Sequence, residues 1–300
     1  MITRRRVLSI IAGGAILPIA GSALGKTGIT RWHGLALGAG AQIIVDHPDA
    51  DRLIAQAVME ISRLERIFSL YLADSELSRL NRNGVLLQPS FEMVELLSLC
   101  SSINQRTKGA FDPTIQALWA LYAKKYSAGE TPSDKEITQA KAQTGWDGIE
   151  FSSERVRFVR PGAALSFNGI AQGFIADKIA ALFTANGVEN VLVNTGEIIG
   201  VGAGADGTGW PVNLGNRNGR EIGLTNQAVA TSAPLGTVFD RAGKVGHIID
   251  PRTGYPGGKW SMVSVIANRA ALADGLSTGF CLMSEPEILA ATGDTQVVLS

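Results

Sequence analysis

The chain has 300 residues, of which 45% are hydrophobic and 18% charged, so it is long enough to bury a substantial core. Its 27 basic and 27 acidic residues cancel, which argues against nucleic-acid binding or attraction to an anionic membrane as the main function, because both need a positive field. The two cysteines, Cys100 and Cys281, lie in apolar runs and are typical of small buried hydrophobes, although a disulfide between them stays open.

Residues 1–25 have the pattern of a signal peptide. An arginine cluster at 4–6 precedes an apolar stretch over 7–20, and small residues ending at Ala23 or Gly25 offer a cleavage site. A membrane anchor is the alternative, but the apolar stretch is short for a span and contains a proline.

The arginine pair followed by Val7 and Leu8 resembles a twin-arginine export signal. No cysteine lies at the cleavage region, so a lipid anchor is not indicated. We therefore expect a bacterial periplasmic protein that is soluble after cleavage. Residues 26–300 are expected to form a single domain, or two intimately joined subdomains, because no linker divides them.

Hydrophobic periodicity and turn residues predict the elements of the first half. Ser90 and Gly109 are expected to cap one helix, and Ser133 with Glu136 forms a capping box at another. In chain order we expect a glycine-broken loop leading into a strand, an amphipathic helix, a polar turn region, two further helices and a hairpin, at residues 35–46, 50–71, 74–84, 90–109, 131–145 and 149–159.

The second half mixes strands and helices without a regular alternation or a repeat. A glycine-bearing loop at 166–173 opens a helix that ends at Asn186-Gly187, and a last helix is predicted over 271–283. Between these helices we expect β segments at 188–194, 212–216, 228–233, 246–250 and 262–268. The pattern predicts an α+β or mixed α/β fold.

Glycines cluster near 196–223, which is typical either of loops close to a ligand or of a surface excursion.

The residues alone carry two chemical signals. The loop at 166–173 precedes a helix whose free N–H groups would suit phosphate, but its spacing disfavours a Rossmann dinucleotide site. Asp274 and Thr278 are four residues apart on one helix face, with Ser277 adjacent, and hard oxygen ligands of this kind suit Mg²⁺. The structural alternative is an aspartate that stabilises the helix dipole and a threonine that bonds back to the helix backbone.

Residues 247–256, HIIDPRTGYP, place one of only three histidines beside a buried-looking strand and an Asp-Pro turn. Several short motifs, in this order, resemble the FAD:protein FMN transferase (ApbE-like) family over residues 35–285. They are ALGA (36–39), FSLYLADSELSRLN (68–81), GAFDPT (109–114), NGIAQGFIAD (168–177), VENVLVNTG (188–196), ATS (230–232), HIIDPRTGYP (247–256) and ALADGLST (271–278).

This resemblance implies a mixed α/β fold related to the T-fold. It implies FAD as substrate, Mg²⁺ dependence, and transfer of FMN to a serine or threonine of a partner protein with release of AMP. His247 holds the family's histidine position and would act as the base. The resemblance places the metal at Gly169, Asp274, Ser277 and Thr278, and the flavin and diphosphate at Leu37, Tyr71, Ala110, Phe111, Asp112, Ser166, Gln172 and Ile249.

The chain departs from the family in the nucleotide pocket rather than at the metal pair. Ser166 stands where the family often has an aspartate, Gln172 where it has a lysine, and Glu197 where it has a second glycine. Ala233 replaces the glycine of the family's Thr-Ser-Gly. These changes leave three hypotheses open: an FMN transferase, an FAD pyrophosphatase that gives free FMN and AMP, and a non-catalytic periplasmic flavin-binding protein.

The leader also resembles that of the branch serving nitrous-oxide respiration, which flavinylates a membrane-associated electron-transfer protein. Retention of His247, Asp274 and Thr278 together favours an enzyme over a binding protein, because pure binding needs no base.

Overall fold

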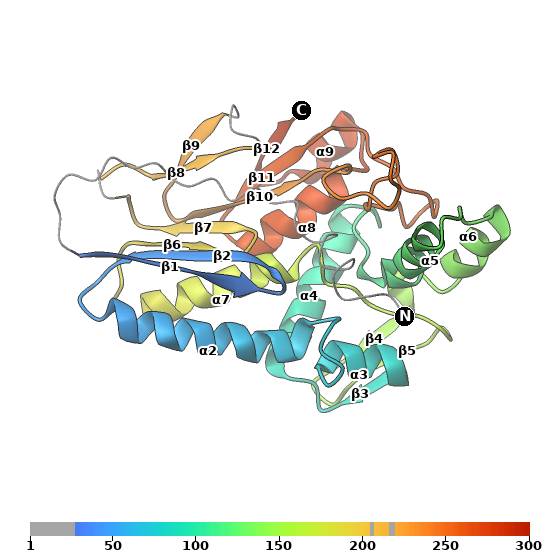
Figure 1. Cartoon of the computed structure of the whole chain (residues 1–300), viewed down its shortest axis with the longest axis horizontal. Coiled ribbons are helices and arrows are strands. Elements are labelled where there is room, and N and C mark those ends of the chain that lie inside the picture. The colour runs from blue at the N-terminus through green and yellow to red at the C-terminus, as the bar shows by residue number, and fades with distance from the viewer. Residues whose placement is uncertain (1–27, 205–206, 216–219) are drawn as a thin grey trace.

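The computed structural model describes residues 28–204, 207–215 and 220–300, so the expected export signal lies outside the described residues. A seven-stranded sheet with the order β1-β2-β6-β7-β10-β11-β12 forms its centre, and all six neighbouring pairs are antiparallel. The strands are β1 (Ile29–Ala36), β2 (Ala39–Asp46), β6 (Val191–Asn194), β7 (Ile198–Val201), β10 (Gln227–Ser232), β11 (Val263–Ala267) and β12 (Gln296–Leu299). Together with its helices, this sheet confirms the expected mixed fold (Figure 1).

Helices α2 (Ala50–Phe68), α7 (Ala171–Ala185) and α8 (Ala270–Phe280) pack on one face of the sheet (Figure 1). Apolar residues of α2 recur at helical spacing, and Leu53, Ala57 and Leu64 have no exposed surface. The ring of Phe68 meets Phe167 and Phe174 edge-on, with centroids 5.9 and 5.4 Å apart. These contacts fix the start of α7 against the core.

A hairpin of β8 (Trp210–Asn213) and β9 (Glu221–Leu224) covers the other face of the sheet. The Trp210 side chain is buried and its Nε1–H donates to the Val201 carbonyl at 2.9 Å. The sheet is therefore packed on both faces, which explains why β11 is buried along its whole length.

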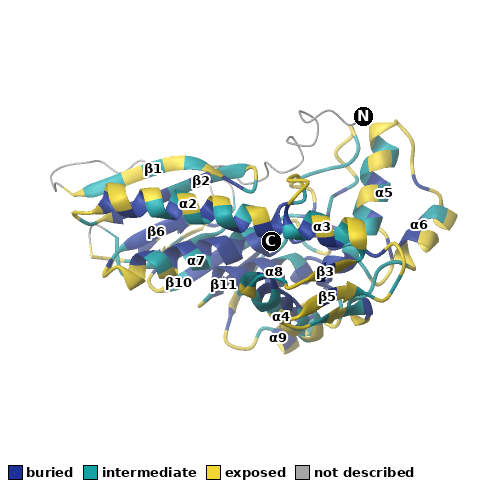
Figure 2. Ribbon diagram, turned by 90° about the horizontal axis from the view of Figure 1, so that it is seen from below, coloured by how far each residue is buried: buried dark blue, intermediate teal, exposed yellow. Residues whose placement is uncertain are grey.

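The remaining elements surround this centre. Leu118, Tyr122 and Ile137 form a separate hydrophobic cluster between α5 and α6, and Figure 2 shows exposed residues along both helices, whereas α7 and α8 are mostly buried. These outer elements are α3 (Glu76–Asn83), β3 (Val85–Leu87), α4 (Phe91–Arg106), η1 (Pro113–Ile115), α5 (Gln116–Ser127), α6 (Asp134–Lys141), η2 (Trp146–Gly148), β4 (Ile149–Phe151), β5 (Arg155–Phe158) and α9 (Glu285–Ala291).

The predicted elements that are wrong in detail include the following three, and the helices expected over 50–71 and 131–145 are shorter, at Ala50–Phe68 and Asp134–Lys141. The polar turn expected at 74–84 contains helix α3, because Leu77 and Leu80 bury one face and Ser75 caps its start. Helix α4 ends at Arg106, and Gly109 lies beyond it in a left-handed turn with φ 78°. The segment 246–250 is a loop that makes only isolated bridges, since an Asp-Pro turn follows it immediately.

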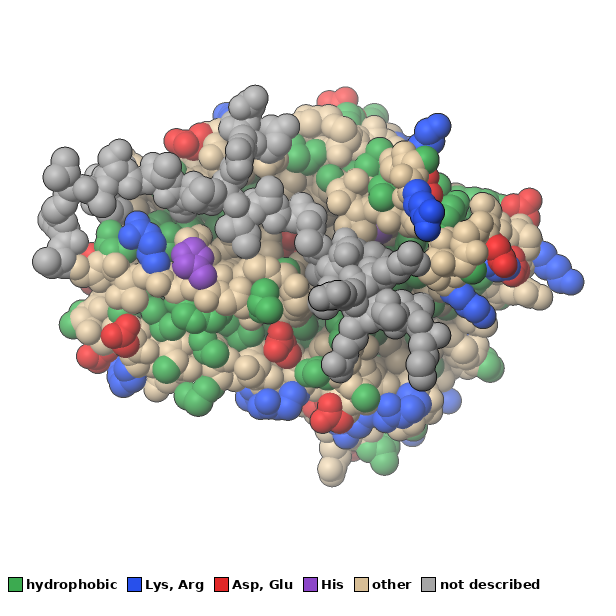
Figure 3. All heavy atoms as spheres, viewed as in Figure 1, with side chains coloured by type: hydrophobic (Ala, Val, Ile, Leu, Met, Phe, Trp, Pro, Cys, Tyr) green, Lys and Arg blue, Asp and Glu red, His purple; other side chains and the backbone are tan. Residues whose placement is uncertain are grey.

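The surface agrees with the balanced composition. On the face seen in Figure 3, basic and acidic side chains of the described residues are interspersed rather than gathered into a patch of one sign. No helix in the described ranges is both long and apolar enough to cross a membrane.

Candidate active site

The site is built where α7 and α8 cross, and each helix supplies a carboxylate to the other's first turn. Asp177 of α7 accepts hydrogen bonds from the N–H groups of Ala270 and Ala271, at 2.6 and 3.1 Å. In return, Oδ2 of Asp274 accepts from the Gly173 N–H at 3.2 Å. A Cβ on Gly173 would stand 2.4 Å from the Ala270 carbonyl oxygen, so only glycine allows the helices to approach this closely.

Hydroxyl groups gather on the same side of α8. Oγ of Ser232, at the end of β10, lies 2.8 Å from Oγ of Ser277 and 3.3 Å from Oγ1 of Thr278. A Cβ on Gly169 would lie 2.8 Å from Thr278 Oγ1, so the backbone of Gly169 runs directly beside this hydroxyl. The structure therefore brings together the four residues expected to hold the metal, with Asp274 one helical turn from Thr278.

Asp274 is an unusual carboxylate because it is 3% exposed yet lies in the middle of a helix. Its pKa is raised to about 8, chiefly by burial; the Gly173 N–H opposes the shift and the nearby charge of Asp177 adds to it. Among the described residues, no hydrogen-bond donor contacts its Oδ1. The alternative role of stabilising its own helix dipole is thus disfavoured, since Asp177 already serves the start of α8.

The donor set fits a small hard cation. One carboxylate, two hydroxyls and a nearby backbone are oxygen ligands of the kind Mg²⁺ takes when substrate phosphates and water complete its shell. The described residues contain no group of three or more histidine, cysteine or acidic side chains that could hold a metal. A site that relies on substrate oxygens needs no such group.

The segment Ala110–Asp112 adjoins this cluster. A Cβ on Gly279 of α8 would lie 3.1 Å from the Cβ of Phe111, so the segment packs against the end of that helix. The Ser166 N–H donates to the Pro113 carbonyl at 2.8 Å, which joins the segment to the loop before α7. Two stretches expected to bind the flavin therefore lie side by side although they are far apart in the chain.

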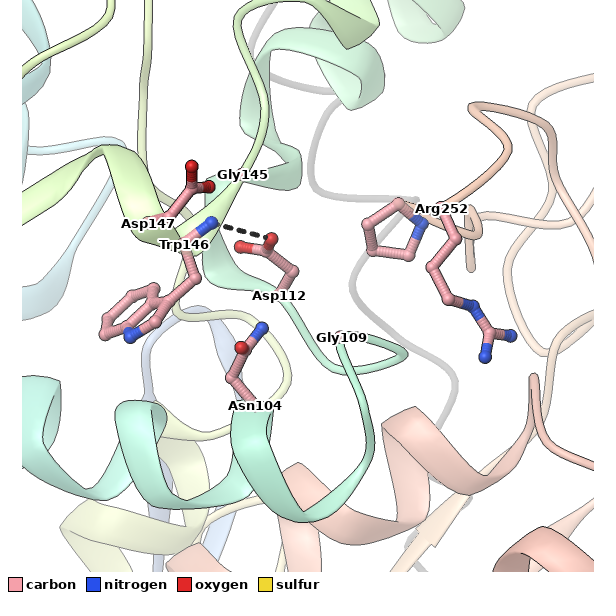
Figure 4. A pocket seen from close by; sticks show the side chains of 8 residues that line it. Asn104, Gly109, Asp112, Gly145, Trp146, Asp147 and Arg252 are labelled. Carbon is pink, nitrogen blue, oxygen red and sulfur yellow. Dashed lines mark hydrogen bonds between the residues drawn. The ribbon is translucent and has the colours of Figure 1, made fainter.

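Asp112 lines a cleft of about 260 Å³ beside this segment (Figure 4). Its Oδ1 accepts from the N–H and Oγ1–H of Thr114, and its Oδ2 accepts from the Trp146 N–H at 3.1 Å. Burial raises the pKa of Asp112, and these donors oppose the shift. Figure 4 shows Arg252, from the 247–256 segment, on the opposite side of the cleft from Asp112.

Leu37 and Tyr71 are both placed by the C-terminal end of α2. Leu37 turns the β1–β2 hairpin with φ 49°, and its N–H donates to Oε1 of Glu65 at 2.6 Å. Tyr71 is 47% exposed, and its N–H donates to Oγ of Ser69 at 3.1 Å. Ile249, in contrast, is 3% exposed within the hydrophobic cluster of α5 and α6, so its side chain supports the fold.

His247 is held by its own loop. Its Nδ1 lies 3.0 Å from the Thr237 carbonyl oxygen. A carbonyl can only accept, so Nδ1 carries the proton and Nε2 is the basic nitrogen. Burial lowers the pKa of His247, and the carbonyls of Thr237 and Pro234 oppose that shift. Pro234 follows Ser232 by two residues, so β10 connects the histidine loop to the hydroxyl cluster.

The turn after His247 forms as the sequence indicates. Oδ1 of Asp250 accepts from the Arg252 N–H at 2.9 Å, and the Asp250 carbonyl accepts from the N–H groups of Thr253 and Gly254. The Arg252 guanidinium pairs with the same carboxylate at 2.8 Å. This closed turn anchors the segment between the histidine and the cleft.

Sequence reasoning did not assign a role to three residues that the structure places at the site. Asp177 and Ser232 lie within the motifs NGIAQGFIAD and ATS, so these motifs could have pointed to them, but the sequence assigns neither residue a role. Glu197 was noted only as a departure, yet its Oε2 accepts from the Thr231 N–H at 3.3 Å, next to Ser232. Gln172, expected at the flavin, lies against Gly196, whose Cβ would stand 2.7 Å from its carboxamide.

A buried oxygen cluster, an adjoining cleft and a histidine whose Nδ1 is held by a backbone carbonyl form the kind of site found in enzymes rather than in structural proteins. A sequence profile of the ApbE family matches residues 37–298, and the chain belongs to this family.

Relatives agree with this assignment. The FAD:protein FMN transferase of Klebsiella pneumoniae (strain 342) is 29% identical, over 86% of this chain and 77% of that protein. The protein of the same name from Haemophilus influenzae is 30% identical, over 74% of this chain and 69% of its own length. The crystal structure of Pseudomonas stutzeri flavinyl transferase ApbE in its apo form has a TM-score of 0.81 and 26% identity, and covers 92% of each chain.

Proposed function

We propose that the protein is an FAD:protein FMN transferase, which moves FMN from FAD to a serine or threonine of a partner protein and releases AMP. The observation that carries this proposal is the cluster of Asp274, Ser277, Thr278 and Gly169 at the α7–α8 crossing, in a chain that belongs to the ApbE family. The names of the curated relatives support the same reaction.

FAD would lie along the surfaces that meet at this cluster. Ala110, Phe111 and Asp112 border the cleft side, and Ser166 joins them through Pro113. Leu37, Tyr71 and Gln172 are proposed as further contacts of the nucleotide, and Ile249 would contribute only through its backbone because its side chain is buried in the cluster of α5 and α6. The neutral Ser166 and Gln172 place no fixed charge of their own beside the diphosphate.

Asp274, Thr278, Ser277 and the Gly169 carbonyl would hold Mg²⁺. The bound ion supplies positive charge that offsets the charge of the diphosphate and of the AMP leaving group. The burial of Asp274 serves this purpose, because a carboxylate in a low-dielectric site attracts a cation more strongly than an exposed one.

His247 would take the proton from the acceptor hydroxyl through Nε2. The acceptor oxygen then forms a bond to the FMN phosphorus, the bond from that phosphorus to the AMP oxygen breaks, and AMP leaves. The lowered pKa of His247 keeps the imidazole neutral at neutral pH, which is the form a base requires. The bond from Nδ1–H to the Thr237 carbonyl fixes the tautomer in which Nε2 is the basic nitrogen.

We also propose that the mature protein acts in the bacterial periplasm after export by the twin-arginine route. The support is the leader sequence, with its arginine pair and apolar stretch. A membrane-associated electron-transfer protein, such as one serving nitrous-oxide respiration, would then be the acceptor.

The test is transfer itself. Mature protein, FAD, Mg²⁺ and a candidate acceptor domain are mixed, and the acceptor is weighed by mass spectrometry. We expect a mass gain of one phosphoester-linked FMN, which EDTA abolishes. Free FMN and AMP with an unmodified acceptor would instead identify an FAD pyrophosphatase, and tight FAD binding without either product would identify a flavin-binding protein.

A further inference from the structure

A second carboxylate faces the α7–α8 crossing from the sheet. Glu197 lies in the turn between β6 and β7, where the Thr195 hydroxyl donates to the Gln172 carbonyl at 2.8 Å and Gly196 adopts φ 110°. The turn is thereby tied to the first turn of α7. Glycine is favoured at this position because a side chain would be strained at φ 110°, and its Cβ would stand 2.7 Å from the Gln172 carboxamide.

One contact of Glu197 itself, and the contacts of the turn that carries it, connect it to the neighbours of the proposed metal ligands. On one side, its Oε2 accepts from the N–H of Thr231, and the following residue, Ser232, contacts the hydroxyls of Ser277 and Thr278. On the other side, Gln172 precedes Gly173, which donates to Asp274.

Electrostatics agree with this placement. Burial and the charge of Asp274 both raise the pKa of Glu197 well above its ordinary value, so the two carboxylates influence each other. Among the described residues, no lysine or arginine forms an ion pair with either one, and no donor contacts Oε1 of Glu197 or Oδ1 of Asp274. Asp274 is buried and Glu197 is half-buried, so two like charges here without a counter-charge are costly, and a bound cation would offset that cost.

We propose that Glu197 supplies a second carboxylate to the divalent cation held by Asp274, an inference that rests on the proposed function of this site. A hard cation gains affinity with each carboxylate in its shell. The site would therefore bind Mg²⁺ or Mn²⁺ before FAD arrives, rather than depending on the diphosphate for most of its negative charge.

The competing role for Glu197 is structural, as an acceptor for the Thr231 N–H. Glu197→Gln separates the two roles, because the amide oxygen can still accept that hydrogen bond but carries no charge. Glu197→Asp keeps the charge on a shorter side chain. Glu189→Gln is the matched control, because Glu189 is exposed and lies just before β6.

The experiment measures Mn²⁺ binding to the mature protein without FAD, by the electron paramagnetic resonance signal of free Mn²⁺, with thermal melting as a check of folding. We expect Glu197→Gln to weaken Mn²⁺ binding about 10–100-fold, with Glu197→Asp recovering part of it and Glu189→Gln unchanged. Should Glu197→Gln fail to fold, Glu197→Asp decides. Its Mn²⁺ affinity should lie below that of the unmodified protein and above that of Asp274→Asn, and an affinity equal to that of the unmodified protein would count against the proposal.

Unchanged affinity in Glu197→Gln, with binding lost in Asp274→Asn, would overturn this inference and leave the proposed function standing. Unchanged affinity in Asp274→Asn as well would instead remove the metal assignment on which both proposals depend.

Discussion

Asp177 and Asp274 lie on crossing helices, and each accepts hydrogen bonds from the first turn of the helix that carries the other. Carboxylates are favoured at helix N-termini because free N–H groups and the positive end of the helix dipole meet there. The exchange fixes α8 relative to α7, and with it the direction in which Asp274 and Thr278 point. Asp177 is thus a positioning residue, since it contacts the backbone of α8 and none of the proposed ligands.

Removal of this cap should weaken the fold and the site together. Asp177→Ala leaves the N–H groups of Ala270 and Ala271 without their acceptor, and we expect a loss of about 1–2 kcal/mol in the free energy of unfolding. Urea denaturation measures the loss. Asp51→Ala, an exposed first-turn residue of α2, is the control and should change stability by less than about 0.5 kcal/mol. Equal stability of the two variants would contradict the capping role.

Close helix packing makes a second prediction. Gly173→Ala would place a methyl group 2.4 Å from the Ala270 carbonyl oxygen, so α8 must shift. We expect a cost of about 1–3 kcal/mol in unfolding free energy, and weaker Mn²⁺ binding because Asp274 moves. Gly257→Ala is the matched control, since its Cβ would have only a contact of 3.7 Å. A Gly173→Ala protein as stable as Gly257→Ala would show that the helices can separate freely.

Replacement of the proposed base should affect chemistry more than binding. We expect His247→Ala to slow FMN transfer about 10²–10⁴-fold, the usual range for general-base help, while FAD still binds. Single-turnover kinetics and a fluorescence titration with FAD measure the two quantities. His33→Ala, on the exposed side of β1, should match the unmodified protein in both. Loss of FAD binding in His247→Ala would make the histidine a structural residue.

The pH dependence has a defined sign. Because burial lowers the pKa of His247, the neutral base persists to more acidic pH than the ordinary value of about 6.5 would allow. The transfer rate should therefore fall on acidification, with the His247 inflection below about 6.5. In His247→Ala that inflection should vanish. A profile of unchanged shape in the variant would assign the titration to another group.

Substitutions of the proposed metal ligands should reduce transfer activity by different amounts. Asp274→Ala removes the buried carboxylate and should abolish most transfer activity, whereas Thr278→Ala should cost less because water can replace a hydroxyl ligand. EDTA should reproduce the Asp274→Ala result in the unmodified protein. Transfer assays by mass spectrometry check all three. Full activity in EDTA would remove the metal from the proposed mechanism.

Local signals in the sequence predicted local structure well. The capping box of Ser133 and Glu136 forms, with the Ser133 N–H donating to Glu136 at 2.9 Å, because its partners are three residues apart. Helix α3 was missed because its sequence is mostly polar, and only its packing against neighbouring elements, among them α2 and β3, buries Leu77 and Leu80. Burial in the folded protein, rather than local helix propensity, makes this segment a helix.

At the site, too, local geometry could be predicted from the sequence and tertiary contacts could not. The spacing of Asp274 and Thr278 was readable because helix geometry alone puts them on one side. The neighbours that complete the cluster could not be read from spacing. Ser232 comes from strand β10, and Glu197 comes from the turn that leads into β7, the strand paired with β10. Their placement depends on strand pairing, which no single segment encodes.

Because the site lies where α7 and α8 cross, it can form only when the chain is completely folded. Gly173 and Asp274 are 101 residues apart in the chain, and Ala271 and Asp177 are 94 apart. A chain that has not closed these long loops has no Asp274 in place, so the cation and FAD would bind only the native state. A ligand at a hundred times its dissociation constant then stabilises that state by about 2.7 kcal/mol. Misfolded copies would neither hold the nucleotide nor consume it.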